Sequence, residues 1–424
     1  MNNILKKSTT LALAASIGMS ILMSGCDKDI PDPEPTTTMT TATTATTVPD
    51  SSVALSELSY APNMEFAINL FNASAAYSQG DNIMISPASI TFALAMLEMG
   101  AEGTSKEEIM NTVFPGMSEE EIEDYVQAFT TRINNSADVS FHTSNSLWFN
   151  DISPASDYLD RVYSSMGAEL FGDKFDSNTY QLINDWVSEN TDGMINNMLS
   201  PEIIDPDLTL SVLVNAISFE GNWNSFIADN NVRPSEFTDY QGNTSEVSTM
   251  FVFEDIYLET SLATGFLKPY VGEQYAFMAI LPTDTTISAT DFAAGFTYED
   301  YMEFFNSAEE FEVTASLPEF TTQSEFEMED PLRDLGINQI FDDGEFAPML
   351  GDTSSPVGVS HVIHSTFIDV NREGTRAAAA TATDVETAMA MEPYFVYLNR
   401  PFCYAIVDME TGMPIFIGAV NSLS

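Results

Sequence analysis

The stretch of sequence that decides the fold runs from Glu373 to Phe402, and residues 373–387 read EGTRAAAATATDVET. Alanine is the best helix former, so composition alone predicts a helix or a loop here. Read at a period of two, the stretch divides into an uncharged set and a set that carries Arg376, Asp384 and Glu386. The uncharged set comprises Thr375, Ala377, Ala379, Thr381, Thr383, Val385 and Thr387. Because alternate residues of a strand point to opposite faces, this loop is also a potential strand with one face suited to burial.

The beginning of this stretch has the form of a hinge. Gly374 lies at its base, where a change of chain direction requires freedom in φ. The hinge residues are Glu373, Gly374, Thr375, Arg376, Ala377, Ala378, Ala379 and Ala380. They resemble the reactive-loop hinge of the serpins. Residues 399–402 (NRPF) and 411–418 (TGMPIFIG) resemble the C-terminal signature of the same family.

The rest of the chain resembles that family in the right order, over residues 82–108, 184–199, 213–226, 313–320 and 332–346. Helical patterns dominate the first half, where Thr104 with Glu107 and Ser118 with Glu121 form capping boxes. Strand patterns dominate after about residue 208, and this order predicts an α+β fold. The resemblance implies the serpin fold, with about eight to nine helices around three mainly antiparallel β-sheets and an exposed reactive-centre loop at about 373–398.

The composition is strongly acidic, with 64 acidic against 13 basic residues and a formal net charge of −51. Such a charge repels nucleic acid, heparin-like polyanions and anionic lipid, so we expect none of these as partners. The two cysteines are Cys26 and Cys403. Because Cys26 belongs to an N-terminal signal, we expect no disulfide within the folded domain.

The N-terminal residues read as an export signal followed by a tether. A positive start at 6–7 and an apolar run at 11–23 precede Ser24-Gly25-Cys26. This resembles a bacterial lipoprotein signal, in which Cys26 is lipidated; the alternative is ordinary secretion with Cys26 incidental. We expect a signal peptide at 1–25, a Pro/Thr-rich disordered tether at 26–57, and a single serpin domain at 58–424. The protein is then exported, either as a surface lipoprotein anchored through Cys26 or as a secreted extracellular protein.

The resemblance implies a suicide-type inhibitor of serine proteases. The target cleaves the reactive loop, and the freed loop inserts into the main β-sheet and traps the protease as an acyl-enzyme. Insertion requires small side chains, and a charge at Thr375, Ala377 or Ala379 should arrest it. Arg376 stands where the family often has an acidic residue; by parity it faces solvent after insertion, so we expect it to be tolerated.

Two positions are open for the cleaved bond. Counting forward from Gly374 with the usual family spacing gives Ala388–Met389, whereas counting back from Asn399 gives Ala390–Met391. Both bonds join small or medium apolar residues. We therefore expect elastase-like or subtilisin-like serine proteases as targets. We also expect the inhibitor to be a monomer.

A buried polar cluster and a tryptophan complete the expected machinery. By resemblance, Ser86, Ser89, Asn215 and His364 match the serpin shutter, whose hydrogen bonds rearrange when the strands part. Trp223 matches the breach, where insertion begins. Asn215 interrupts an apolar run at 210–219 and needs hydrogen-bond partners if it is buried.

Other classes of function find little support in the sequence. The three histidines are His142, His361 and His364, and there is no G-x-S-x-G motif, so we do not expect an enzyme. His361 and His364 lie on opposite faces of a predicted strand, and no phosphate-binding or dinucleotide-binding motif is present; we expect no metal and no cofactor. The alternative is a non-inhibitory binding or surface protein with the serpin fold. The small hinge residues favour inhibition.

Overall fold

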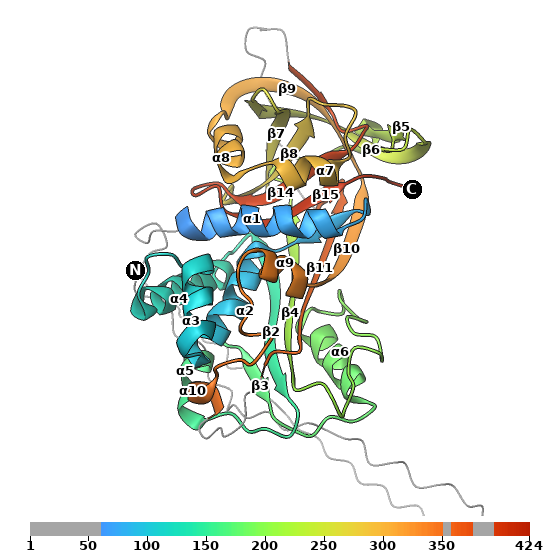
Figure 1. Cartoon of the computed structure of the whole chain (residues 1–424). Coiled ribbons are helices and arrows are strands. Elements are labelled where there is room, and N and C mark those ends of the chain that lie inside the picture. Colours follow the sequence, from blue (N-terminus) through green and yellow to red (C-terminus); the bar gives the residue numbers. More distant parts are fainter. Residues whose placement is uncertain (1–60, 351–357, 376–393) are drawn as a thin grey trace, which may run out of the picture. The chain divides into compact units, whose positions relative to one another are not determined.

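Two β-sheets organise the described part of the chain, which comprises residues 61–350, 358–375 and 394–424 of the computed structural model (Figure 1). The first sheet has six strands in the order β10-β11-β12-β4-β2-β3. These strands are β10 (Phe320–Glu327), β11 (His361–Asn371), β12 (Gly374–Thr375), β4 (Ser211–Asn222), β2 (Val139–Phe149) and β3 (Glu169–Phe171). The β11–β4 and β2–β3 pairs are parallel, and the other pairs in this sheet are antiparallel.

The second sheet has nine strands, ordered β1-β15-β14-β8-β7-β6-β9-β13, with β5 paired to β6. They are β1 (Ile83–Ile85), β5 (Val232–Thr238), β6 (Thr244–Glu259), β7 (Ala263–Pro269), β8 (Tyr275–Pro282), β9 (Glu309–Pro318), β13 (Tyr394–Tyr397), β14 (Phe402–Asp408) and β15 (Pro414–Val420). β6 is 16 residues long and pairs with β5, β7 and β9. The long strand β6 therefore joins β5 at one end to β7 at the other within a single sheet.

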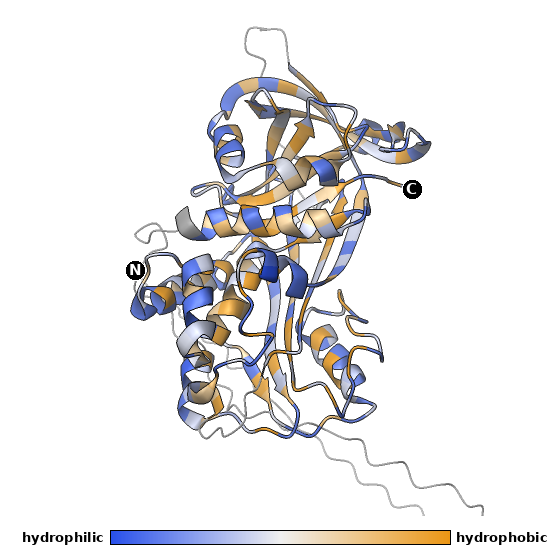
Figure 2. Ribbon diagram, in the orientation of Figure 1, coloured by the Kyte–Doolittle hydropathy of each residue, from blue (hydrophilic) through white to orange (hydrophobic). Residues whose placement is uncertain are grey.

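The described residues form ten α-helices and one 3₁₀ helix, η2 (Asp229–Asn231). The α-helices are α1 (Ala61–Tyr77), α2 (Pro87–Gly100), α3 (Gly103–Val113), α4 (Glu119–Asn134), α5 (Ser156–Met166), α6 (Thr179–Asn190), α7 (Ala289–Gly295), α8 (Tyr298–Asn306), α9 (Glu329–Asp334) and α10 (Ala347–Leu350). All 14 residues of α2 are buried, because its surface is apolar on nearly every side. α1 carries hydrophilic residues between hydrophobic ones along its length (Figure 2). No helix in the described ranges is long and apolar enough to cross a lipid bilayer.

The predicted α+β class and the predominance of antiparallel strands are confirmed. The helix count is slightly higher than predicted. The described strands form two hydrogen-bonded sheets instead of the predicted three, because β6 is continuous. Of the two predicted capping boxes, Ser118–Glu121 is present at α4. The Thr104–Glu107 box is wrong: α3 begins at Gly103, and the distant Glu345 carboxylate accepts the backbone N–H of Ser105 at 3.1 Å instead.

The core lies on both faces of β4. Leu213, Ile217 and Phe219 belong to the main core between the sheets. The intervening residues Val212, Val214 and Ala216 pack in a second, smaller core with Ile183 and Val187 of α6. β4 is therefore buried on both faces, as expected for a central strand written as a continuous apolar run.

Candidate functional site

The predicted hinge forms the short strand β12, which lies between β11 and β4. Gly374 pairs with Asn371 on one side and Asn222 on the other. Thr375 pairs in the same way with Val370 and Gly221. Both ladders are antiparallel, so the hinge backbone already occupies one end of the space between these two strands.

Gly374 is required by the closeness of its neighbours. A Cβ atom at this position would collide with the carbonyl oxygen of Gly221 and would lie 2.8 Å from Cα of Asn222. Its φ of +157° is also a value that side-chain-bearing residues rarely adopt. Glycine is therefore needed at the base of the hinge for two reasons, the lack of space for a Cβ atom and the value of φ.

Thr375 is fully buried, and its side chain enters an aromatic cluster. The Thr375 Oγ1 and Tyr270 Oη atoms are 2.7 Å apart. Tyr270 stacks on Trp223 with 4.7 Å between ring centroids, and the Trp223 indole donates to the Asn371 carbonyl at 2.8 Å. Burial raises the pKa of Tyr270, so the hydroxyl stays protonated. The predicted breach residue Trp223 thus holds the chain on both sides of the hinge turn, since its backbone N–H also reaches Glu373 O at 3.3 Å.

An ion pair fixes the residue before the hinge. The Arg372 guanidinium donates to both Glu319 oxygens, from Nε at 3.0 Å and from Nη2 at 3.2 Å. The Arg372 backbone N–H donates to the same carboxylate at 3.2 Å. Partial burial opposes ionisation of Glu319, but these hydrogen bonds hold its pKa below the ordinary value.

Beyond the hinge, β11 and β4 pair directly. Seven parallel pairs run from His361↔Val212 to Phe367↔Ser218. Within this seam, His364 lies opposite Asn215, and the His364 Nδ1 and Asn215 Oδ1 atoms are 2.5 Å apart. The sheet is thus occupied by the hinge at one end and closed along the rest of the seam.

The four predicted shutter residues lie together in a buried polar cluster. The Ser86 backbone N–H donates to His364 Nε2 at 2.9 Å, and Ser86 Oγ donates to the Ile415 carbonyl at 2.6 Å. Asn215 Nδ2 contacts the Ser89 hydroxyl at 2.6 Å and Asn145 Oδ1 at 2.5 Å. The cluster ties β4 and β11 to the start of α2 and to β2.

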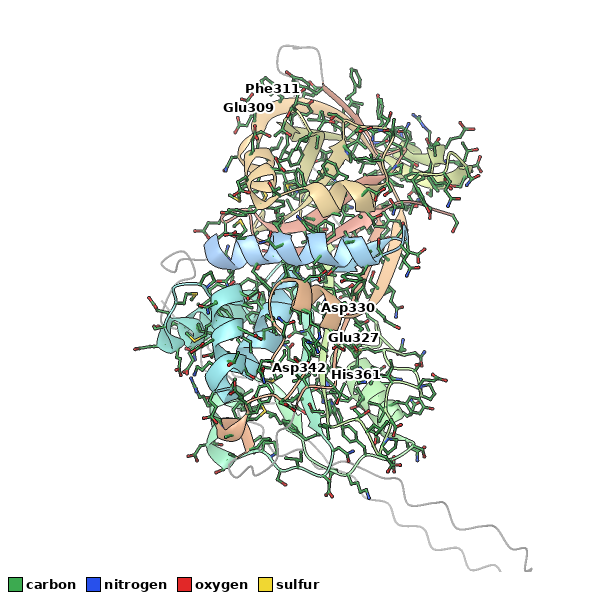
Figure 3. The ribbon with its side chains drawn as sticks, in the orientation of Figure 1. Glu309, Phe311, Glu327, Asp330, Asp342 and His361 are labelled. Atoms are coloured by element: carbon green, nitrogen blue, oxygen red, sulfur yellow. The ribbon has the colours of Figure 1, made fainter. Side chains whose placement is uncertain are left out.

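These contacts define the tautomer and the protonation state of His364. Because Nε2 accepts a hydrogen bond from an N–H group, the proton of the neutral ring is on Nδ1 and is donated to Asn215. Complete burial lowers the pKa of His364 to about 3, although the bond to Asn215 opposes the shift. The ring is therefore neutral at physiological pH. His361, three residues earlier in β11, contacts Glu327 at 2.9 Å, and the two residues lie side by side in Figure 3.

A family model described as "Serpin (serine protease inhibitor)" matches residues 61–423. The chain belongs to the serpin family. Serpin B6 of Pongo abelii is 31% identical over 372 residues, which cover 85% of this chain and 98% of that protein. Serpins are in general inhibitors of serine proteases rather than catalytic enzymes.

Solved serpin structures share the fold. The native state of a thermophilic serpin, tengpin, matches with a TM-score of 0.80 and 33% identity, covering 89% of this chain and 96% of that one. The latent state of tengpin matches with a TM-score of 0.73 and 32% identity, covering 86% and 98%. The chain is therefore more similar to the native state of that serpin.

The predicted serpin site residues fall into two groups. Ser86, Ser89, Asn215 and His364 are brought into contact, and Trp223 lies with Glu373, Gly374 and Thr375 at the hinge. Arg376, Ala377, Ala378, Ala379 and Ala380 lie outside the described residues, as do Cys26 and the bond candidates Ala388, Met389, Ala390 and Met391. Within the described ranges, no group of three or more His, Cys, Asp or Glu side chains is arranged to hold a metal ion.

Several contacts of the serpin hinge and of the buried polar cluster could not be predicted from the sequence. Tyr270 and Asn145 lie far along the chain from their partners, and no local pattern marks them. Lys268 is fully buried, 5.1 Å above the Trp223 ring, and pairs with Glu254 at 2.7 Å. Lys268 was the one signal of such a contact in the sequence, because it lies in the strand at 263–269 and a lysine is almost never buried without a partner.

Proposed function

We propose that this serpin is a suicide-type inhibitor that traps serine proteases as acyl-enzymes by inserting its cleaved reactive loop between β11 and β4. The observation that carries this proposal is β12. Gly374 and Thr375 already pair with both neighbouring strands, antiparallel to each. Further insertion continues an existing strand, so no new register has to be found.

The register of β12 gives the extent of that insertion. Since Gly374 pairs with Asn222 and Thr375 with Gly221, each later loop residue meets the preceding residue of β4. Val385 then lies opposite Ser211, the first residue of β4. An inserted strand ending near Val385 fills the length of β4, in agreement with the uncharged alternation of the sequence.

The same register places Thr381 at the polar cluster. On one side it meets Asn215, and on the other, counting from Val370↔Thr375, it meets His364. Inserting Thr381 separates these two residues and replaces their hydrogen bond. A threonine hydroxyl both donates and accepts, so it can satisfy the groups that it separates.

After insertion, the same register would turn Ala378, Ala380 and Ala382 toward α6. These side chains are small where Ile183 and Val187 of α6 cover the sheet. The register would also place Arg376 opposite Glu220, on the face away from the main core. Glu220 would then lie next to the charge that departs from the family pattern.

The change in strand pairing also accounts for the free energy that would drive insertion. Insertion replaces one ladder of seven parallel pairs with two antiparallel ladders, and antiparallel pairing is slightly more stable per residue. Each added hydrogen bond contributes about 1 kcal/mol net. Ten or so such bonds, with the burial of apolar groups, rival the stability of a whole domain, about 5–15 kcal/mol. The native state is then held kinetically.

For the target, we propose serine proteases of elastase-like or subtilisin-like specificity, cleaving at Ala388–Met389 or Ala390–Met391. We also propose export of the chain with residues 1–25 as signal peptide, lipidation of Cys26, and a tether at 26–57 that holds the domain at 58–424 away from the membrane.

Incubation with pancreatic elastase or subtilisin, followed by denaturing electrophoresis, tests the mechanism. A covalent adduct is expected, and sequencing of the released fragment identifies the cleaved bond. Cleaved protein should also unfold at a higher temperature than intact protein. Cleavage with no adduct and no gain in thermal stability would favour the non-inhibitory alternative.

A further inference from the structure

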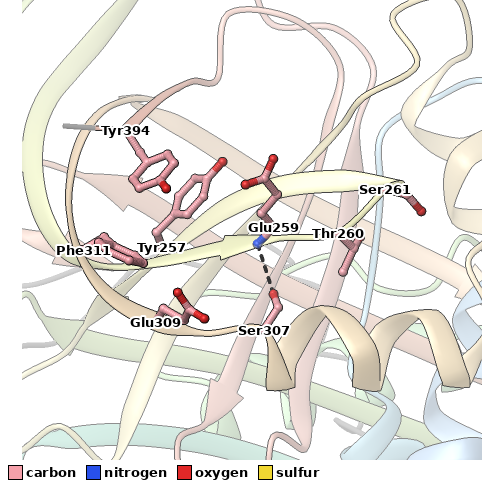
Figure 4. Close-up of a pocket in the computed structure, with 8 residues that line it drawn as sticks. All are labelled: Tyr257, Glu259, Thr260, Ser261, Ser307, Glu309, Phe311 and Tyr394. Carbon is pink, nitrogen blue, oxygen red and sulfur yellow. Dashed lines mark hydrogen bonds between the residues drawn. The ribbon is translucent and has the colours of Figure 1, made fainter. Parts of the chain in front are cut away.

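A pocket of about 510 Å³ lies where the end of β6 meets the start of β9 and β13 (Figure 4). Its lining residues are Tyr257, Glu259, Thr260, Ser261, Ser307, Glu309, Phe311 and Tyr394. Ser307 Oγ accepts the Glu259 backbone N–H at 3.0 Å, which fixes the rim. A volume of this order is typical of small-ligand sites, about 300–1,000 Å³.

The aromatic side chains form a layered wall. Tyr257 and Tyr394 stack with 4.1 Å between ring centroids and an interplanar angle of 16°. Phe311 approaches Tyr394 at 5.3 Å. Aromatic faces carry a negative quadrupole and attract organic cations within about 6 Å.

Both charged side chains of the lining are carboxylates, Glu259 and Glu309. Burial, together with the charge and hydrogen bonding of Glu259, raises the pKa of Tyr257 to about 12, so the Tyr257 hydroxyl stays protonated. Glu309 lies directly opposite Tyr257 in the β6–β9 ladder. Stacked rings next to carboxylates match a flat or compact organic cation better than a metal ion, which prefers several oxygen or nitrogen ligands.

The position of the pocket relates it to the reactive loop. Tyr394 begins β13, directly after residues 376–393, and β13 pairs only with β9 in the described part of the sheet. Phe395 and Tyr397, on the other face of β13, are 60% and 40% exposed. Both proposed cleavage sites precede Tyr394 by only a few residues of sequence, so a protease that cleaves there must come close to this end of the sheet.

We propose that this pocket binds the guanidinium or ammonium group of a basic side chain. The group lies against the Tyr257–Tyr394–Phe311 wall, and Glu259 and Glu309 balance its charge. The group could come from a protease held on the reactive loop or from a free cationic compound. The second source does not depend on the proposed inhibitory function.

Binding of N-acetyl-arginine methylamide to the intact chain, followed by NMR titration, tests the pocket. The neutral citrulline analogue has nearly the same shape and should bind at least about tenfold more weakly. Tyr394→Ala and Glu309→Gln should each weaken arginine binding by about three- to thirty-fold. The matched controls are Phe395→Ala and Glu310→Gln, neighbouring positions that do not line the pocket. Equal binding of both probes, or equal loss in the control variants, would overturn the proposal.

The rate of adduct formation with pancreatic elastase separates the two sources. If the protease supplies the basic group, Glu309→Gln slows the reaction, Glu310→Gln does not, and free N-acetyl-arginine methylamide competes. If these rates are unchanged while the probe still binds, a free cation is the occupant. If the chain is not an inhibitor, the outcome is a third one: the unsubstituted chain gives no adduct with elastase but still binds the probe.

Discussion

The two ends of the seam between β4 and β11 are held in different ways. At the hinge end, β12 separates the strands, and Thr375 is anchored on Tyr270 within an aromatic cluster. Further along, the strands pair directly, and His364 bonds to Asn215 at 2.5 Å within a polar cluster. The same two strands are thus open at one end and closed at the other.

This difference would separate two requirements of the proposed inhibitory mechanism. At the hinge end, Thr375 shares one side-chain hydrogen bond with Tyr270, and the surrounding apolar and aromatic contacts are non-directional. Hydrogen bonds between buried polar groups have strict geometry and are costly to leave unmade. We infer that the hinge end starts insertion and that the polar cluster resists its progress.

The largest expected effect comes from a charge at the hinge end. Thr375→Arg places a guanidinium where the side chain is fully buried against Tyr270, and an unpaired buried charge costs several kcal/mol. We expect β12 to leave the sheet and adduct formation to fall by at least about 100-fold, since each 1.4 kcal/mol is a factor of ten. Electrophoresis after incubation with elastase measures the ratio of adduct to cleaved chain.

Glu373→Arg is the matched control for this prediction. Glu373 is exposed, one residue outside β12, so the same new charge remains in solvent there. The control should keep most of its adduct formation. Equal inhibition by the Thr375→Arg variant would mean that the hinge end does not initiate insertion.

The closed end is tested by Asn215→Ala. The substitution leaves the Nδ1–H group of His364 and the side chain of Asn145 without their partner, at a cost of about 1–3 kcal/mol for each buried group. We expect a lower unfolding midpoint and faster spontaneous loss of inhibitory activity during incubation. His361→Gln, in the same strand but on the opposite face, should change neither quantity. Slower loss of activity in the Asn215 variant would contradict the role assigned to the polar cluster.

Much of the closed end could be predicted from the sequence. Asn215 interrupts an apolar strand, and a buried amide must have partners; resemblance then named Ser86, Ser89 and His364. The uncharged alternation after Gly374 likewise predicted a strand, and Gly374 and Thr375 begin one. These signals are local, because burial and strand parity leave a pattern in consecutive residues.

The missed contacts depend on tertiary distance. Tyr270 meets Thr375 across 105 residues, and Glu319 meets Arg372 across 53 residues. The failed Thr104 capping box has the same cause, because Glu345 reaches the start of α3 from a distant segment. A short-range pattern cannot reveal a partner that the fold supplies from elsewhere.

The polar cluster also predicts a pH dependence. The pKa of His364 is about 3 in the native chain, against an ordinary 6.5, so between these values this side chain takes up a proton only in the unfolded chain. The stability that the neutral ring contributes is fully present above pH 6.5, and it is lost by about 1.4 kcal/mol per pH unit between 6.5 and 3. Urea unfolding at pH 7.5 and pH 5.5 measures this slope. His364→Gln should have a flatter dependence than the unsubstituted chain.

His361→Gln serves as the control for the pH experiment, because His361 lies at the surface next to Glu327. Glu98 and Glu254 have pKa values raised by burial, and such carboxyl groups favour the native chain as pH falls. They are present in every variant, so their effect cancels in the comparison. An unchanged slope after His364→Gln would show that the buried ring does not set acid stability.

The smallest effect is expected from the ion pair just outside the hinge. Arg372 is 38% exposed and Glu319 is 19% exposed, so solvent screens the pair and its contribution is about 0.2–1 kcal/mol. Arg372→Glu should raise the rate of adduct formation only a few-fold, because the chain entering β12 is held less tightly. The double variant Arg372→Glu with Glu319→Arg restores opposite charges and should return the rate toward its original value. If the double variant does not restore the rate although Arg372→Glu alone changes it, the geometry of the pair, and not its charge, holds the residue before the hinge. The reason is that exchanging the two side chains does not recreate the same bidentate hydrogen bonds.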